Sequence, residues 1–244
     1  MPERVPTANG APLPARLIES YRAFRSGAHA AARDRYRRLA EDGQRPRTMV
    51  VACSDSRSAP EAIFDAGPGE LFVLRNVAAL VPPYAPDGSL HGVSAALEYA
   101  VLALEVPAIV VMGHGRCGGI AAALEDAAPL SATDFVGTWV AGVRDLAAEL
   151  DLSGEIAEPG TRRRELERRS VERSLDHLRT FPWIRRREEA RILTLHGAWF
   201  DIALGELHAL GRRGWQRVDP ATALDERALS RGLRTERSPR SRRA

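Results

Sequence analysis

The chain has 244 residues, a formal net charge of +3 at pH 7, and ordinary fractions of hydrophobic (44%) and charged (27%) residues, which is typical of a globular protein with one large domain or two small ones. The positive excess lies in 221–244, with seven arginines and three acids, so the rest of the chain, at −1, offers no case for a nucleic-acid-binding surface. No apolar run approaches the roughly 20 residues of a membrane helix, and 1–14 lacks the apolar segment of a secretory signal, so we expect a cytoplasmic protein.

The two ends of the chain are predicted to be disordered around a single folded domain. Residues 1–14 are rich in proline and small residues and offer little to bury, and 212–244 is polar and Arg-rich. Between them, 15–211 forms the predicted domain. It begins with a helical arm, 15–42, in which apolar residues recur at helical spacing and Gly27 divides the run into two helices.

Strands and helices alternate along the rest of the domain. Short apolar runs predict four buried strands, at 48–52, 71–74, 108–112 and 191–195. The pattern also predicts a helical turn at 60–64, helices at 92–104, 120–125 and 135–150, and a charged helix from residue 162 that Pro182 ends. The dense charge of 162–173 predicts a solvated helix face, and Val171, Leu175 and Leu178 give this helix an inner stripe. A hairpin of 199–202 and 206–210 is expected at the sheet edge. This order predicts an α/β fold with a mainly parallel central β-sheet, about four parallel strands plus an edge strand, flanked by helices.

Two short motifs carry the most distinctive chemistry. Cys53 follows the first strand, and His114 and Cys117 follow the third. Sites in open α/β sheets form outside the carboxyl ends of strands, so these loops can bring both thiols and the imidazole to one point. A disulfide is the alternative for the chain's two cysteines, but a cytosolic chain seldom uses one and a disulfide does not need a histidine nearby. We therefore predict a metal site, and two thiolates with one imidazole suit zinc.

The number of protein ligands separates a catalytic zinc site from a structural one. Structural sites usually have four, but the chain has no third cysteine, and its remaining histidines have no second ligand type beside them. Asp55 is able to close the site as a fourth ligand. Alternatively, Arg57 pairs with Asp55, keeps it ionised and off the metal, and leaves one position open for water. Gly118 and Gly119 fit a tight turn after Cys117, with backbone N–H groups free for an anion.

These motifs resemble those of a known family, the β-class carbonic anhydrases. The resemblance is carried by Cys-Ser-Asp-Ser-Arg at 53–57 and Gly-His-x-x-Cys-Gly-Gly at 113–119, with further similar segments at 68–70, 72–78, 98–101 and 196–200. It covers roughly 15–210 and leaves out both ends of the chain.

The resemblance implies a fold, a cofactor and a reaction. The enzyme would be a zinc lyase, also called carbonate dehydratase, that hydrates CO2 reversibly to bicarbonate and a proton by means of zinc-bound hydroxide. Cys53, His114 and Cys117 would bind zinc, and Asp55 with Arg57 would form the catalytic dyad.

The resemblance also implies a substrate pocket and an oligomer. Gln44 stands where the plant-like branch of the family has a glutamine that hydrogen-bonds substrate, and Phe72, Val77 and Tyr99 match the apolar wall that holds CO2. We add Gly118 to these substrate-binding candidates for its backbone N–H. In that branch some of these groups come from the neighbouring subunit, which implies a homodimer or homotetramer.

A second branch of the family differs at one informative position. It has a tryptophan three residues before the first ligand, as part of an inhibitory bicarbonate site. Val50 takes that position in this chain, which argues against this form of regulation although Arg75 fits the motif.

Other functions stay open at this stage. An enzyme of the same fold acting on CS2 or COS would carry the same ligands, because the shape of the tunnel decides between these substrates and CO2. A non-catalytic, zinc-stabilised interaction protein would have a closed site, and an Asp55–Arg57 pair together with Gln44 counts against it. A binder of RNA or an acidic partner would use the Arg-rich tail, although a short basic tail is more often a solvated terminus. The proton shuttle is open between Asp55, Tyr84 and buffer.

Overall fold

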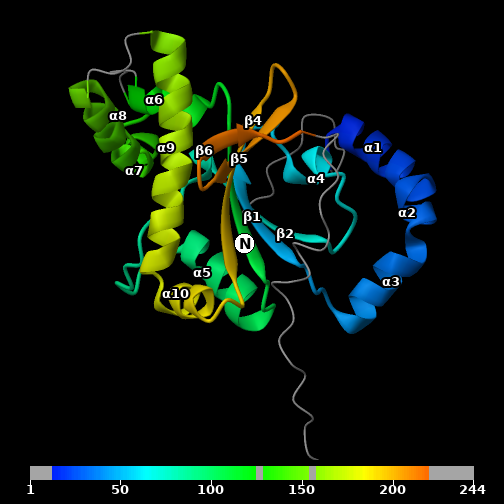
Figure 1. Ribbon diagram of the computed structural model, residues 1–244. Coiled ribbons are helices and arrows are strands. Elements are labelled where there is room, and N and C mark those ends of the chain that lie inside the picture. The colour runs from blue at the N-terminus through cyan, green and yellow to red at the C-terminus, as the bar shows by residue number, and fades with distance from the viewer. Residues whose placement is uncertain (1–12, 125–128, 154–157, 220–244) are drawn as a thin grey trace, which may run out of the picture.

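The computed structural model describes residues 13–124, 129–153 and 158–219, arranged around one six-stranded sheet in the order β2-β1-β3-β4-β5-β6 (Figure 1). The strands are β1 (Thr48–Cys53), β2 (Leu71–Asn76), β3 (Ala108–His114), β4 (Thr194–Asp201), β5 (Glu206–Gly211) and β6 (Gly214–Arg217). The first four strands are parallel, and β5 and β6 extend the sheet as antiparallel neighbours. The predicted α/β fold with four parallel strands is confirmed.

β1 and β3 form the buried middle of the sheet. Every residue from Met49 to Cys53 is buried, as a continuous apolar run predicts for a strand covered on both faces. Met49 and Val51 face α5 (Gly92–Glu98), α9 (Pro159–Thr180) and α10 (Pro182–Glu189). Val50 and Ala52 alternate to the other face, where Ile63 of α4 (Pro60–Ile63) packs.

A second, smaller core lies at the carboxyl ends of the parallel strands. It joins Cys53 to α6 (Gly118–Leu124), α8 (Ala141–Ser153) and the partly buried Trp139 of α7 (Phe135–Trp139). Val140 separates α7 from α8, so the single helix predicted at 135–150 is two helices. Figure 1 shows these helices beside α9, and they cover the end of the sheet where the two motifs lie.

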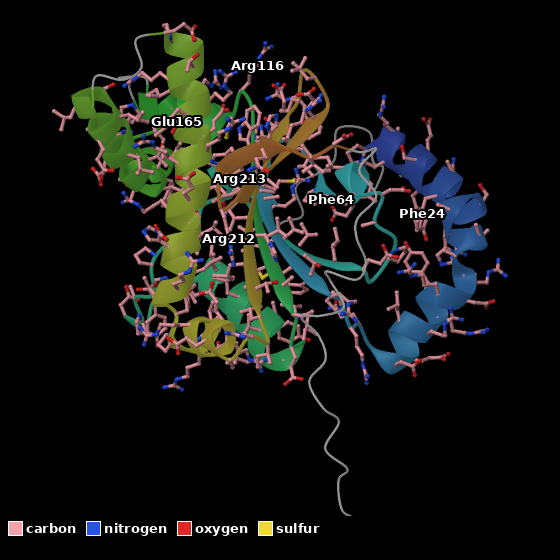
Figure 2. All side chains as sticks on the ribbon, in the orientation of Figure 1. Phe24, Phe64, Arg116, Glu165, Arg212 and Arg213 are labelled. Atoms are coloured by element: carbon pink, nitrogen blue, oxygen red, sulfur yellow. The ribbon has the colours of Figure 1, made fainter. Side chains whose placement is uncertain are left out.

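The N-terminal arm lies on the other side of the molecule, beside β2 (Figure 1). It comprises α1 (Ala15–Ser26), α2 (Ala28–Ala31) and α3 (Arg33–Asp42), and none of its helices buries a residue. Gly27 ends α1 as predicted, but the rest of the arm forms two helices, α2 and α3, where the sequence predicted one. Arg35 ties the arm to the domain by donating to the Pro68 carbonyl and the Glu70 carboxylate, both at 2.8 Å. The aromatic Phe24 stays 37% exposed on this arm (Figure 2), so the arm presents apolar surface to its surroundings.

The helix predicted at 92–104 changes type in its middle. α5 runs directly into a π-helical turn, η2 (Tyr99–Ala103), in which the Leu104 N–H donates to the Tyr99 carbonyl at 3.0 Å. Tyr99 is 51% exposed and its ring centroid lies 5.9 Å from that of Phe72 on β2, whereas Val101 is fully buried. Within this one turn, Tyr99 therefore contacts the edge strand β2, whereas Val101 packs into the core.

The bounds predicted for the fourth strand are wrong. The predicted strand at 191–195 and the predicted hairpin arm at 199–202 belong to one strand, β4, which pairs with β5. The strand continues through Gly197. A Cβ built at this position would lie 3.2 Å from side-chain atoms of Leu210 and Val171. The glycine therefore allows close packing of α9 and β5 on β4.

The start predicted for the Arg-rich tail, residue 212, is wrong, because ordered structure continues beyond it. The sheet continues past Gly211 into β6 through a turn at Arg212 and Arg213 (Figure 2). Trp215 on β6 donates from its indole nitrogen to Glu172 of α9 at 2.7 Å, which fixes the strand to the domain. The disorder predicted for 1–12 and 220–244 lies outside the described residues. Among the described helices, none combines the length and the apolar character needed to cross a membrane.

Candidate metal centre

Cys53, His114 and Cys117 meet at the carboxyl ends of β1 and β3. Their exposed fractions are 5%, 1% and 2%, and one ligand atom from each lies within 4.8 Å of the others. The two strands are parallel neighbours with Ala52 opposite Met112, so the residues that follow reach the same edge of the sheet. The Sγ atoms are 3.9 Å apart and both thiols are free, so the alternative of a disulfide is wrong.

Backbone N–H groups face both sulfurs. Cys117 directly precedes α6, whose first N–H groups have no partner inside the helix. The N–H groups that favour the thiolate form are those of Gly119 and Ile120 at Cys117, and those of Asp55 and Ala78 at Cys53. The loops therefore suit negatively charged sulfur.

The two thiols do not ionise equally. The hydrogen bond between the two sulfurs lowers the pKa of Cys53. The same hydrogen bond, together with burial, raises the pKa of Cys117. A second negative charge at 3.9 Å from the first needs a compensating cation, so the pair is suited to hold one.

His114 has the tautomer of a metal ligand. Its Nδ1 lies 2.9 Å from the Gly115 carbonyl and donates to it, so that in the neutral ring Nε2 carries the lone pair. Nε2 is buried and has no hydrogen-bond partner. Metal-ligating histidines almost always donate their other ring N–H to a carbonyl or carboxylate in this way. An orphaned nitrogen beside two thiols fits zinc well.

Asp55 and Arg57 form a bidentate pair beside the three candidate ligands. Arg57 donates from Nε to Oδ1 at 2.9 Å and from Nη2 to Oδ2 at 2.7 Å, and its backbone N–H donates to Oδ1 at 2.9 Å. These hydrogen bonds hold the pKa of Asp55 well below its usual range. Asp55 Oδ2 lies 4.0 Å from His114 Nε2. Because Arg57 engages both oxygens, the geometry favours a hydrogen-bonding Asp55 over a fourth ligand.

Arg75 fixes the loop that carries Asp55. Its Nε donates to the Cys53 carbonyl at 2.8 Å and its Nη2 to the Asp55 carbonyl at 2.6 Å. Val50, the other position compared with the bicarbonate-regulated branch, is a core residue of β1 at 1% exposed. The guanidinium of Arg75 is thus committed to the backbone of the site.

Glu167 is a site residue that sequence reasoning missed. Its side chain is 2% exposed, and its carboxylate accepts from the Cys117 N–H at 3.1 Å and from the Trp199 indole at 3.2 Å. Burial raises the pKa of Glu167. The available signal was its position four residues before Val171, on the inner stripe of α9. The charge density of 162–173 instead led to the prediction of a solvated face.

Two of the predicted substrate-binding residues lie at the metal centre. Val77 follows β2, and its Cγ1 lies 2.6 Å from where a Cβ on Gly119 would be. Gly118, one residue after Cys117, has open space around its Cβ position. The Val77 side chain is 38% exposed. An apolar wall and free space therefore adjoin the candidate ligands.

The other three lie away from it. Gln44 precedes β1 at the amino end of the sheet, while Cys53 ends that strand. Phe72 pairs with Met49 and touches Tyr99. The strand rises about 13 Å between Met49 and Cys53, so Gln44, Phe72 and Tyr99 are out of reach of the thiols of their own chain.

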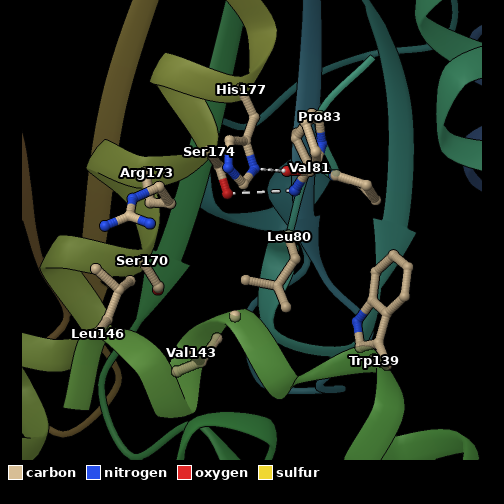
Figure 3. Close-up of a pocket in the computed structure, with 12 residues that line it drawn as sticks. Leu80, Val81, Pro83, Trp139, Val143, Leu146, Ser170, Arg173, Ser174 and His177 are labelled. Carbon is tan, nitrogen blue, oxygen red and sulfur yellow. Dashed lines mark hydrogen bonds between the residues drawn. The ribbon is translucent and has the colours of Figure 1, made fainter. Parts of the chain in front are cut away.

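A cavity of about 160 Å³ lies beside the loop that follows Val77 (Figure 3). It lies between 80–83, α8 and α9, and the three candidate ligands are not among its lining residues. His177 Nδ1 donates to the Val81 carbonyl at 2.7 Å, and the Val81 N–H donates to Ser174 at 3.2 Å. His177 and Ser174, two polar residues that line the cavity, therefore hold the loop in place.

Comparison with known proteins gives concordant matches. Residues 48–207 match the family model described as carbonic anhydrase. A carbonic anhydrase of Pseudomonas aeruginosa is 38% identical over 213 residues, 87% of this chain and 94% of that protein. The chloroplastic β carbonic anhydrase 5 of Arabidopsis thaliana is 34% identical over 176 residues, 69% of this chain and 55% of that protein.

Solved structures share the fold as well as the sequence. The β-carbonic anhydrase CcaA has a TM-score of 0.76 and 33% identity, covering 85% of this chain and 92% of that one. One of two tetrameric β-carbonic anhydrases from Sordaria macrospora has a TM-score of 0.71 and 30% identity, covering 80% of this chain and 95% of that one.

Proposed function

Because the chain belongs to the β-class carbonic anhydrases, lyases that hydrate CO2 reversibly to bicarbonate and a proton, we propose that Cys53, His114 and Cys117 hold one zinc ion for this reaction. The observation that carries the proposal is the buried, unpartnered Nε2 of His114 beside two thiols. When bound, zinc supplies a Lewis acid that lowers the pKa of water to roughly 7, so that a nucleophile exists at neutral pH.

Asp55 and Arg57 are the proposed catalytic dyad. The ionised carboxylate accepts a hydrogen bond from the nucleophile and directs its lone pair at CO2, and Arg57 holds the carboxylate in that orientation. With both oxygens of Asp55 engaged by Arg57, zinc held by Cys53, His114 and Cys117 would keep one position for water, which counts against a closed, non-catalytic zinc site.

The substrate pocket is proposed to form between two copies of the chain. Val77 and Gly118 adjoin the ligands, whereas Gln44, Phe72 and Tyr99 lie away from them and would complete the pocket of a second subunit. The Sordaria relative is described as tetrameric. We propose a homodimer or homotetramer of the plant-like branch, in which a glutamine and an apolar wall hold CO2 weakly.

The cytoplasm is the proposed compartment. Two free thiols as metal ligands suit a reducing environment. Cell fractionation of the native host tests this separately from the activity.

Metal content measured alongside stopped-flow CO2 hydration tests the function. The wild-type chain is expected to carry about one zinc per subunit. Cys53→Ser and His114→Ala should lose both zinc and activity. Asp55→Asn should keep zinc and lose about 100-fold or more of the rate, the usual cost of removing a hydrogen-bonding group from the reacting atoms. Hydration retained by a zinc-free Cys53→Ser protein would refute the proposal.

Asp151→Asn is the matched control. Asp151 makes the same kind of bidentate contact, with Arg162 at 2.8 and 2.7 Å, on the surface, so its removal should leave zinc and rate unchanged. Parallel assays with COS and CO2 separate the carbonic anhydrase from an enzyme of the same fold that prefers sulfur-containing substrates.

A further inference from the structure

We propose that Glu167 and Arg163, two residues of α9, are positioning residues that clamp the backbone of Cys117 and thereby set the zinc affinity of the centre. The inference rests on the proposed zinc function and concerns side chains outside the three ligands and the Asp55–Arg57 dyad. The contacts concerned join α9 to the backbone of Cys117.

Both backbone groups of Cys117 are held by this pair. The Cys117 N–H donates to Glu167 Oε1 at 3.1 Å, and Arg163 Nη2 donates to the Cys117 carbonyl at 2.9 Å. Arg163 Nε also lies 3.4 Å from Glu167 Oε1. Residues four apart share one face of a helix, so a single turn of α9 fixes the peptide units on both sides of the Cys117 side chain.

The other oxygen of Glu167 connects the clamp to the His114 turn. Trp199 of β4 donates to Glu167 Oε2 at 3.2 Å. A Cβ on Gly115 would lie 3.1 Å from Trp199 Cζ2, so the indole packs directly against the turn that follows His114. Arg168 stacks on the same indole, 4.7 Å from the ring centroid. One buried carboxylate thus joins the supports of two ligands.

The donors around Glu167 specify a carboxylate at this position. A backbone N–H and an indole N–H donate to its two oxygens, the Arg163 guanidinium lies 3.4 Å from Oε1, and the side chain is 2% exposed. A glutamine has one acceptor oxygen and one donor NH2 group. Glu167→Gln therefore sets a donor against a donor and leaves a buried N–H unpaired, with almost no change in volume.

Zinc affinity of the full-length chain, measured by competition with a chromophoric chelator, is the direct test. Substitution of groups that orient metal ligands typically lowers affinity about 10- to 100-fold, and this range is expected for Glu167→Gln. Cobalt substitution gives a second readout, because thiolate-to-cobalt absorption reports how Cys117 meets the metal. Both readouts address the centre directly, unlike a melting temperature.

Glu165→Gln is the matched control. Glu165 lies on the same helix (Figure 2) and pairs with Arg169 at 3.0 Å, but it is one-third exposed and outside the clamp. Its substitution should leave zinc affinity within about twofold. Should Glu167→Gln fail to fold, Arg163→Gln decides the matter, with an expected loss of about 3- to 10-fold for one hydrogen bond to the Cys117 carbonyl.

The outcomes also separate this inference from the proposed function. A wild-type chain that binds no zinc overturns the function. A wild-type chain that binds zinc, with Glu167→Gln or Arg163→Gln variants that bind it equally well, overturns the clamp alone. A Glu167→Gln variant that loses only thermal stability, at unchanged zinc affinity, does the same.

Discussion

At the scale of single residues, the centre depends on backbone conformations that alanine and arginine rarely adopt. Ala78 and Ala79 are consecutive left-handed residues (φ 64° and 57°), and Arg116, between two ligands, has φ 57°. Each costs about 1–2 kcal/mol relative to the right-handed form. In return, the Ala78 N–H faces the Cys53 sulfur. Local strain next to the ligands is thus held in place by the buried packing around it.

Glycine is needed opposite this turn for space. A Cβ on Gly119 would lie 2.6 Å from Val77 Cγ1 and 3.0 Å from Ala78 Cβ. Gly119→Ala is therefore expected to destabilise the fold by about 1–3 kcal/mol, the usual cost of overpacking, as measured by urea denaturation. It should also lower zinc affinity, since the displaced turn carries the Ala78 N–H.

The neighbouring glycine supplies the comparison. Nothing lies within 4 Å of a Cβ built on Gly118, so Gly118→Ala should keep the wild-type stability. If the two substitutions destabilised the protein equally, the loss would come from a general effect on helix α6 and not from the contact of residue 119 with Val77 and Ala78.

Residue types explain which parts of the site the sequence revealed. Cys53, His114 and Cys117 could be predicted because each follows a recognisable apolar strand and sites form at those strand ends. Asp55 and Arg57 followed from adjacency. Helical spacing puts Glu167 on the inner stripe of α9, but its role could not be predicted, because its partners are a backbone N–H and an indole far along the chain.

At the scale of elements, α9 is the support on which the centre rests. Val171 lies so close to β3 that a Cβ on Gly113, next to His114, would be 2.8 Å from its Cγ2. Helical periodicity correctly placed Val171, Leu175 and Leu178 on the inner face of this helix, and all three are buried. The predicted break between the strand at 191–195 and the hairpin was wrong, because β4 runs unbroken through Gly197, where α9 and β5 pack closely on the strand.

Removing one apolar contact of α9 tests its contribution. Leu178 is fully buried, so Leu178→Ala is expected to destabilise the protein by about 2–5 kcal/mol. Leu152 at the end of α8 is 90% exposed, and Leu152→Ala should change stability by less than about 0.5 kcal/mol. Chemical denaturation of both variants, monitored by tryptophan fluorescence, gives the comparison. A Leu178→Ala protein as stable as the Leu152→Ala control would mean that α9 packs on the sheet more loosely than the structure shows.

At the scale of the whole molecule, the predicted pocket residues divide into two groups at different ends of the sheet. Val77 and Gly118 adjoin the ligands, whereas Gln44, Phe72 and Tyr99 do not. In the proposed oligomer the second group would complete the pocket of a neighbouring subunit, and spacing along one chain does not show which subunit a residue serves. The arm also carries exposed apolar side chains, those of Leu17, Tyr21 and Phe24.

Mixed oligomers test whether a second subunit completes the site. Gln44→Ala and Cys53→Ser chains, each expected to be poorly active alone, are co-expressed with different tags and the mixed dimer is purified. Its Gln44→Ala subunit keeps the metal ligands and receives an intact Gln44 from its partner. The mixed dimer should therefore recover about half of the wild-type CO2 hydration rate, one complete site of two. Activity no higher than that of the Gln44→Ala protein would place Gln44 within its own subunit's site or outside catalysis.

The π-helical turn at Tyr99–Ala103 limits how this chain can change length over evolution. Each residue of an ordinary helix advances the side chains by about 100°. Deleting a single residue here would restore regular winding and keep the flanking turns in phase, but it would redirect the side chains inside the turn. Either Tyr99 would swing away from Phe72 or Val101 would leave the core. Relatives that keep both contacts should therefore share the extra residue, and a gap in this short stretch should accompany loss of the aromatic pair.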